Sequence, residues 1–203
     1  IVNKSAINEF NHATNILKGD ASFQVKARTG FFNELILDEF LDLKKKFGIL
    51  EISPVLELSL VTKNNHKINI IGLDFFRAVK TTPGFSAIPD LNRKKLSSTD
   101  NDVKNNRLTI FDQKSIFLPP IAQKKIGVSN GDPISILYAG KEIVFNVAGS
   151  LSNSVGDNVA VVDIAAFQHA FNLYGKLSRL DFKVSSENNY DPSRNRKLLV
   201  TKK

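Results

Sequence analysis

The sequence contains no cysteine, no methionine and no tryptophan among its 203 residues. Without cysteine the chain has no disulfide framework, no cysteine-ligated zinc finger, no thiol nucleophile and no thioredoxin-type redox site. The lack of cysteine is compatible with an oxidising compartment, although many cytosolic proteins lack it too. Because position 1 is isoleucine rather than methionine, we expect the sequence to be an internal or processed piece of a gene product.

Residue patterns that carry catalysis are also missing. The three histidines, His12, His66 and His169, lie far apart, which argues against a histidine-rich metal site. The glycines form neither a nucleophile elbow (G-x-S-x-G) nor a phosphate-binding loop (G-x-x-x-x-G-K-[ST] or G-x-G-x-x-G). No carboxylate pair stands in an apolar context suited to acid/base catalysis. We therefore predict a non-catalytic protein with no cofactor and no metal; a hydrolase assembled from scattered residues is a minor alternative.

Long apolar runs are absent as well. No stretch reaches the roughly 18 consecutive apolar residues needed to cross a bilayer. The apolar residues near the start are spaced rather than continuous, unlike those of a signal peptide. An apolar fraction of 42% and a charged fraction of 24% are ordinary for a globular protein. The length suits one domain or two small subdomains.

The net charge is +8, and its distribution is uneven. About half of the excess lies in Tyr190–Lys203, which contains Arg194, Arg196, Lys197, Lys202 and Lys203 against Asp191. Elsewhere basic and acidic residues alternate, as in Glu34–Lys46, a pattern typical of a solvated helix face. A nucleic-acid-binding protein usually gathers its positive charge on one folded face, so nucleic-acid binding is the alternative rather than the preferred function. The basic tail suits a position beside anionic lipid headgroups.

Hydrophobic periodicity predicts two helices and a strand in the first 48 residues. Ala6, Phe10, Ala13 and Leu17 recur at helical spacing, and Gly19 ends that helix. Alternation in Ala21–Lys26 predicts a half-buried strand. After a turn at Thr29-Gly30, a second helix places Phe32, Leu35, Ile36, Phe40 and Leu43 on one side and ends at Gly48.

A β-hairpin is predicted next. Ile49–Thr62 is extended, with a break at Pro54, and Lys67–Leu73 returns after the turn Lys63–His66.

The segment from Thr81 to Asn106 is poor in apolar residues and rich in polar ones. We predict that it is the most mobile interior segment and projects from the junction of two subdomains. The candidate partner contacts in it are Phe85 and the basic cluster Arg93, Lys94 and Lys95; exposed phenylalanines at Phe75-Phe76 and Phe85 suit a partner or a lipid-like ligand. The alternatives are a loop folded back onto its own core and a spacer without a role.

The remaining chain is predicted to be rich in strands. Extended segments are expected in Arg107–Leu118, Pro133–Tyr138, Ile143–Gly149, Val159–Val162 and Ser178–Val184, with a helical turn at Ala122–Ile126 and a tight turn at Asn130-Gly131-Asp132. Asp163 caps a helix that Gly175 ends, with Ile164, Phe167, Ala170, Phe171 and Tyr174 facing inward. Asp191-Pro192 has the form of a helix start.

The order of these segments resembles a known family. The strand end Gly72-Leu73-Asp74-Phe75-Phe76 is followed by Phe117–Val128, by the turn Asn130-Gly131-Asp132, and by the strand end Val147-Ala148-Gly149. The helix start Asp163-Ile164-Ala165 and the strand around Leu180 complete the series. In this order and spacing they resemble the MacB-like periplasmic core domain of FtsX-like permeases of ABC transporters. The resemblance covers about residues 2–184.

The resemblance implies an α+β fold, in which a porter-like α/β subdomain carries an inserted β-rich subdomain. Residues 1–90 would form the first part of the porter-like subdomain. Residues 91–175 would form the inserted β-rich subdomain with its closing helix. Residues 176–203 would supply the return strand and the basic tail.

The resemblance also implies a function. The chain would be a non-catalytic domain on the periplasmic or extracellular side of a bacterial inner-membrane permease, between its first two transmembrane helices. It would couple helix motion to substrate or partner handling in export or in lipoprotein or lipid release. Its partners would be the membrane-embedded remainder of the permease and, indirectly, a cytoplasmic ATPase subunit. A periplasmic protein or a lipid-like substrate would be a further partner, and nucleic acid would not.

Overall fold

The computed structural model describes residues 23–44, 49–90 and 108–184. Its strands are β1 (Phe23–Lys26), β2 (Phe32–Asn33), β3 (Ile49–Thr62), β4 (Lys67–Leu73), β5 (Ile88–Pro89), β6 (Ser115–Leu118), β7 (Pro133–Tyr138), β8 (Lys141–Ser150), β9 (Val159–Asp163), β10 (Lys176–Leu177) and β11 (Arg179–Val184). Its helices are α2 (Ile36–Leu43), α3 (Phe75–Thr81), α5 (Pro120–Ile126) and α6 (Ile164–Phe171), with 3-10 turns η1 (Pro83–Phe85), η2 (Leu108–Phe111) and η3 (Asn153–Val155). The predicted helix around Phe10, its stop at Gly19, the stop at Gly48 and the helix start at Asp191 lie outside the described residues.

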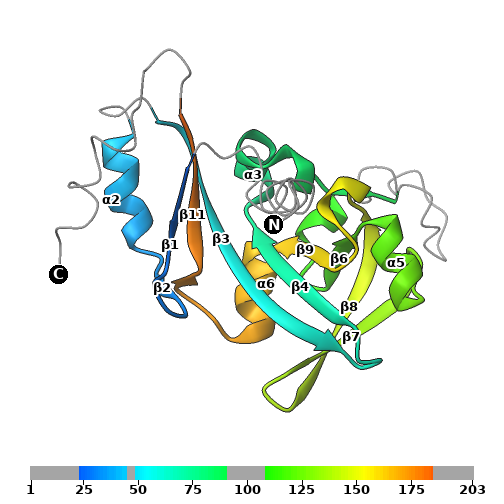
Figure 1. Ribbon diagram of the computed structural model, residues 1–203. Helices are drawn as coiled ribbons and strands as arrows, with labels where there is room; N and C mark the ends of the chain where they lie inside the picture. The colour runs from blue at the N-terminus through cyan, green and yellow to red at the C-terminus, as the bar shows by residue number, and fades with distance from the viewer. Residues whose placement is uncertain (1–22, 45–48, 91–107, 185–203) are drawn as a thin grey trace, which may run out of the picture.

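Within the described residues, nine strands form one sheet, and part of this sheet closes on itself. Strands β3, β4, β9, β6, β8 and β7 pair in that order, and β7 pairs back onto β3 to complete a ring. Strands β11 and β1 extend the sheet from β3 on the other side. Figure 1 shows the ring at the right and the β1–β11–β3 layer at the left, with the long β3 running through both.

The predicted hairpin of β3 and β4 is confirmed, but the predicted break at Pro54 is wrong. The carbonyl of Val55 accepts a bond from Ser178 N–H on the β11 side. Since neighbouring residues in a strand direct their backbone groups to opposite edges, Pro54 directs its missing N–H to the β4 side. Pairing with β4 begins only at Val55, opposite Leu73, so Pro54 removes no bond from that ladder. The strand therefore continues through the proline.

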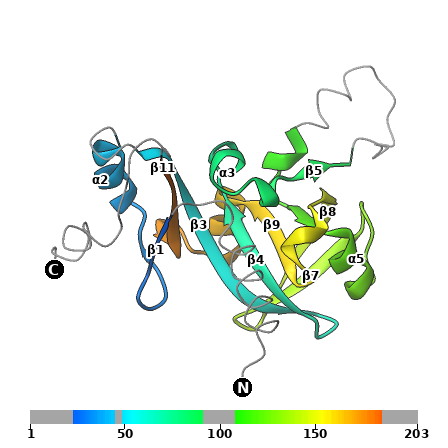
Figure 2. The ribbon, with the colours of Figure 1, turned by 45° about the horizontal axis from the view of Figure 1, so that its top comes forward.

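Two apolar clusters occupy the two faces of this sheet. The larger one includes Ile68, Ile70, Phe145 and Phe167, and it fills the ring and the face covered by α2 and α6. The smaller one includes Ile71, Leu73, Phe117 and other side chains that point the opposite way and meet α3. Figure 2 shows α3 beside the end of β4. Because successive residues of a strand point to opposite faces, Ile68 and Ile70 of β4 enter one core, and Ile71 and Leu73 enter the other.

Two aspartates start the helices on these opposite faces. β4 and β9 are parallel neighbours, and Leu73 lies opposite Asp163 at their carboxyl ends. The Asp74 carboxylate accepts from Phe76 N–H and Arg77 N–H at the start of α3, and Asp163 accepts from Ala165 and Ala166 at the start of α6. The prediction that Asp163 caps a helix is confirmed, since a carboxylate satisfies amides that the first turn leaves unpaired.

Helix α6 ends earlier than predicted. Asn172 adopts the left-handed conformation at its C-terminus, with φ of 53°, and its N–H reaches the carbonyls of Gln168 and His169. Asparagine tolerates this conformation better than most residues, so it replaces the predicted stop at Gly175. The chain leaves the helix axis there, and Tyr174, predicted to face inward, is 59% exposed.

The second predicted helix also starts later than its apolar spacing indicates. Phe32 and Asn33 form β2, which pairs with β10, and α2 begins at Ile36. Asn33 accepts Leu35 N–H through its side chain, a local turn that delays the helix.

The first ten residues of the predicted mobile segment are packed structure. Thr81, Thr82 and Phe85 are buried, and Ile88 and Pro89 pair with Ser150 and Gly149 of β8. Gly149 makes this pairing feasible, because a Cβ there would lie 2.2 Å from the carbonyl oxygen of Ile88. The predicted projection of the segment is therefore wrong for residues 81–90, and residues 91–106 lie outside the described part of the chain.

The predicted α+β fold class is confirmed: helices pack on both faces of a mixed sheet. The division at residues 90 and 175 stays a prediction. Strands from the two intervals share one sheet, since β4 pairs with β9 and β3 pairs with β7.

Candidate functional sites

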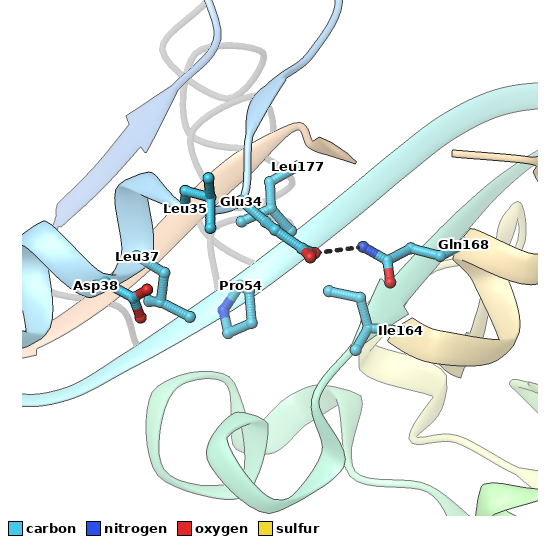
Figure 3. Close-up of a pocket in the computed structure, with 8 residues that line it drawn as sticks. All are labelled: Glu34, Leu35, Leu37, Asp38, Pro54, Ile164, Gln168 and Leu177. Atoms are coloured by element: carbon cyan, nitrogen blue, oxygen red, sulfur yellow. Dashed lines mark hydrogen bonds between the residues drawn. The ribbon is translucent and has the colours of Figure 1, made fainter. Parts of the chain in front are cut away.

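A groove lies between α2 and α6 over the middle of β3, and we call it the α2–α6 groove. It measures about 280 Å³ and is lined by Glu34, Leu35, Leu37, Asp38, Pro54, Ile164, Gln168 and Leu177. Figure 3 shows Pro54 from β3 between Leu37 on the α2 side and Ile164 on the α6 side. The proline that removes a backbone donor from the strand therefore also supplies an apolar surface between the two helices.

The rim of the groove is polar and carries one hydrogen bond across it. The Gln168 side-chain amide donates to Glu34 Oε2 at 2.8 Å, so the two side chains point toward one another over the gap (Figure 3). Glu34 and Asp38 are exposed, and they are the charged residues in the lining. The groove thus combines an apolar interior with a negative rim.

A second concave surface surrounds the outer side of α3. Phe76 is 74% exposed, Val79 59% and Phe111 40%, and the rings of Phe76 and Phe111 stack with centroids 5.1 Å apart. Together with the half-buried Ile110 these residues form what we call the α3 surface. A hollow of about 320 Å³ here has no charged residue in its lining. Large exposed apolar side chains that cluster in this way are typical of a contact surface.

An ionic cluster holds α2, β3 and α3 together at one end of the sheet. Glu51 lies within salt-bridge distance of Lys44, Arg77 and Lys80, at 3.6, 3.7 and 3.3 Å. Burial acts to raise the pKa of Glu51, but the Ile52 N–H and the lysines outweigh burial and hold that pKa below its usual value. Arg77 also donates to the carbonyl of Ile52 at 3.0 Å. That bond satisfies the Ile52 carbonyl, which has no partner in β4 because the pairing of β3 with β4 begins only at Val55.

On the face of the sheet that carries Glu51, a buried arginine, Arg179, lies between two carboxylates. Arg179 Nε donates to Asp181 Oδ1 at 3.0 Å, and its Nη1 contacts Glu57 Oε2. Arg179 and Asp181 are both buried, and Asp181 is directly opposite Ser53 in the β11–β3 register. Burial raises the pKa of Asp181, and the nearby Arg179 only partly offsets that effect. None of these three residues lines the α2–α6 groove described above.

Of the sequence-predicted contact residues, Phe85 is the one that lies in the described part of the chain. Phe85 is fully buried, so the predicted partner contact through its side chain is wrong, and the alternative of a segment folded back onto its core holds for that residue. The Phe85 ring fills the smaller apolar cluster. Arg93, Lys94 and Lys95 lie outside the described residues. Of the pair Phe75-Phe76, Phe75 is buried and Phe76 is exposed, as the helical turn at their position dictates.

Neither histidine in the described part of the chain belongs to a cluster that could hold a metal ion. His169 is exposed, and its Nδ1 lies 2.6 Å from the Tyr174 hydroxyl. His66 is half-buried in the β3–β4 turn, and His12 lies outside the described residues. Within the described ranges no three histidine, aspartate or glutamate side chains gather closely enough to hold a metal ion. No helix in those ranges combines the length and apolar content that crossing a bilayer requires.

Sequence reasoning did not find the α2–α6 groove. Its lining comes from four elements spread between Glu34 and Leu177, and each residue alone reads as an ordinary core or surface position. The proline inside an apolar strand and the acidic residues at the start of α2 were the available signals.

Comparison with known proteins rests on structure alone, because no family model matches the sequence and no curated protein does. The chain is similar to the extracellular domain of the noncanonic ABC-type transporter YknZ from Gram-positive bacteria. That match has 15% sequence identity and a TM-score of 0.50, and it covers 81% of this chain and 83% of the other. The periplasmic region of MacB from Actinobacillus actinomycetemcomitans also matches, with 15% identity, a TM-score of 0.49, and coverage of 93% of this chain and 86% of the other. The likeness to YknZ confirms, at the level of fold, the resemblance that the sequence motifs predicted.

Proposed function

We propose that this chain is an extracytoplasmic domain of an ABC transporter permease. The observation that carries the proposal is the likeness of its fold to the extracellular domain of YknZ over most of both chains. The motif series from Gly72 to Leu180 supports the same family independently of the fold.

In this role the domain is non-catalytic. It transmits motion of the membrane helices to a substrate or a partner protein, in export or in lipoprotein or lipid release. The membrane-embedded remainder of the permease anchors it, and a cytoplasmic ATPase subunit drives it. A periplasmic protein or a lipid-like substrate meets its outer surface.

The location can be tested with a single cysteine, because the chain has none of its own. Asn64 is exposed in the β3–β4 turn, so Asn64→Cys leaves the core untouched. In cells that make the full-length protein, we expect a membrane-impermeant maleimide to label this variant as fully before lysis as after it. The parent protein, labelled in parallel, corrects for cysteines elsewhere in the gene product. Labelling only after lysis would place the domain in the cytoplasm and contradict the proposal.

The partner contact can be tested at the α3 surface. Phe76→Ser and Phe111→Ser remove the exposed aromatic pair, and we expect each to reduce both transport and co-purification of partner proteins with the full-length permease. The loss of the ring stack should cost only about 1 kcal/mol of folding free energy, so the domain stays folded. Ile121→Ser is the matched control, because Ile121 is 50% exposed on α5, outside the α3 surface. Unchanged transport and co-purification in both phenylalanine variants would remove the α3 surface from the proposal.

A further inference from the structure

The α2–α6 groove has a charge that is opposite to that of the chain. The net charge is +8, yet the lining contains Glu34 and Asp38 and no basic residue. The neighbouring Lys176 contributes its backbone carbonyl, which accepts from Gln168, and its side chain is not part of the lining. A cationic group entering the rim therefore meets two carboxylates.

The interior of the groove is suited to aliphatic side chains. Leu37, Pro54, Ile164 and Leu177 present hydrocarbon surface, and Leu177 is buried beneath the rim. A volume of about 280 Å³ lies just below the roughly 300–1,000 Å³ of ordinary small-molecule pockets. The space therefore accommodates one or two side chains rather than a large cofactor.

The hydrogen bond across the rim is one that a cation can replace. Gln168 offers Glu34 a neutral amide, whereas a guanidinium or ammonium group makes a charge-assisted bond that is roughly twice as strong. Gln168 then turns its amide to other acceptors, such as a peptide carbonyl turned toward its N–H₂. An anionic headgroup or a phosphate meets only repulsion at the same rim.

We propose that the α2–α6 groove binds an extended segment of a partner protein in which a large aliphatic side chain stands beside an arginine or lysine. The aliphatic side chain lies against Pro54 and Ile164, and the cation pairs with Glu34 and Asp38. This inference goes beyond the proposed function, because it depends on the groove alone and not on a position outside the cytoplasm.

Three matched peptides test this inference on the purified 203-residue chain. The probes are acetyl-Leu-Arg-Leu-amide, acetyl-Leu-Gln-Leu-amide and acetyl-Leu-Glu-Leu-amide, each titrated while amide resonances are followed by NMR. We expect the arginine peptide to shift the resonances of Leu35, Ile164 and Gln168 in a saturable way. The glutamine peptide should bind about tenfold more weakly, which corresponds to about 1.4 kcal/mol. The glutamate peptide should not saturate.

Charge-removing variants complete the test. In the double variant Glu34→Gln and Asp38→Asn, we expect the preference for the arginine peptide over the glutamine peptide to disappear. Both residues are exposed, so an unchanged melting temperature verifies that the variant is folded. Glu142→Gln, at an exposed carboxylate on β8, is the matched control and should keep the full preference. Equal binding of all three peptides, no binding of the arginine peptide, or shifts centred on the α3 surface would each overturn the inference.

Discussion

Gly72 is a residue at which α6 packs tightly against the sheet. A Cβ at this position would lie 2.7 Å from Phe167 Cβ and 2.8 Å from its Cγ. Neither atom is the mobile end of a side chain, so the helix itself would have to move away from β4. Gly72→Ala should therefore lower the free energy of unfolding by about 1–3 kcal/mol, measured by urea denaturation.

Gly84→Ala is the natural comparison, because the nearest atom to its new Cβ would be Val155 Cγ1 at 3.9 Å. We expect that variant to match the parent closely. Equal stability of the two variants would show that the packing of α6 on β4 does not require a residue without a side chain at position 72.

The pKa of Asp181, raised by burial, gives stability a pH dependence of unusual sign. The folded state holds this proton more tightly than the unfolded state does. Stability therefore falls as pH rises from the ordinary carboxyl pKa of about 4 to the raised value. Asp181→Asn removes this contribution, so its stability relative to the parent should rise across that window and level off above it.

Glu142 provides the opposite case, because bonds from Ser135 and Lys63 lower its pKa. The stability that such a group contributes is present above its unfolded pKa and is lost as pH falls. The stability of Glu142→Gln relative to the parent should therefore fall as pH rises from about 3 to 5, as measured by urea denaturation at each pH. The same sign for both variants would contradict these assignments.

For single residues, prediction from sequence succeeded where the local conformation depends only on the residue and its neighbours in the chain. Asp163 caps its helix because a short acidic side chain reaches the free amides of the first turn wherever the helix packs. Phe85 and Tyr174 were misjudged because their burial depends on segments distant in sequence. Phe85 belongs to the same buried cluster as Phe117 and Val155. Tyr174 follows a helix end that Asn172 sets.

At the scale of elements, the ring is completed by a short pairing between β7 and β3. β7 meets β3 through Ile136 opposite Thr62 and Leu137 opposite Val61. Ile136 is fully buried inside the ring. Ile136→Ala should destabilise the protein by about 2–5 kcal/mol, because a buried cavity replaces the side chain at the closure.

Lys63 joins the same region to β8 through an ion pair with Glu142, but 63% of its side chain is exposed. Lys63→Ala should therefore change stability by about 0.5 kcal/mol or less, as measured by the same denaturation experiment. A larger loss for Lys63→Ala than for Ile136→Ala would mean that surface charge rather than packing closes the ring.

Local pattern predicted most elements, including the β3–β4 hairpin and the turn Asn130-Gly131-Asp132. It did not predict α3, because the apolar residues Phe75 and Phe76 come almost directly after β4 and resemble the end of that strand. It also missed β5, a strand of two residues whose pairing depends on Gly149 about sixty positions later. The ring and the α2–α6 groove are products of such distant pairings, which no local pattern contains.

At the scale of the whole molecule, β3 is shared by the ring and by the β1–β11 layer. A strand common to both parts couples their stability, so we expect a single cooperative unfolding transition despite the predicted division into subdomains. The absence of tryptophan allows a clean test. Phe40→Trp reports on the α2 side, where Phe40 contacts Phe182, and Tyr138→Trp reports on the ring, where Tyr138 contacts Phe171.

In each tryptophan variant, fluorescence and far-ultraviolet circular dichroism should give the same urea midpoint. Fluorescence midpoints that depart from the circular dichroism midpoint in opposite directions in the two variants would show that the parts unfold separately.

The place of β11 also governs how the protein is made. β11 lies between β1 and β3, so the last described strand enters the sheet between two strands from the beginning of the described chain. During synthesis, β3 is complete at residue 62 while its neighbour is complete only at residue 184. At about 5–20 residues per second the ribosome needs roughly 6–24 s to cover that distance. For that time the β3 edge and the Ile52 side chain have no native neighbour in β11, and an unpaired strand edge of this kind is a template for pairing with another copy of the chain.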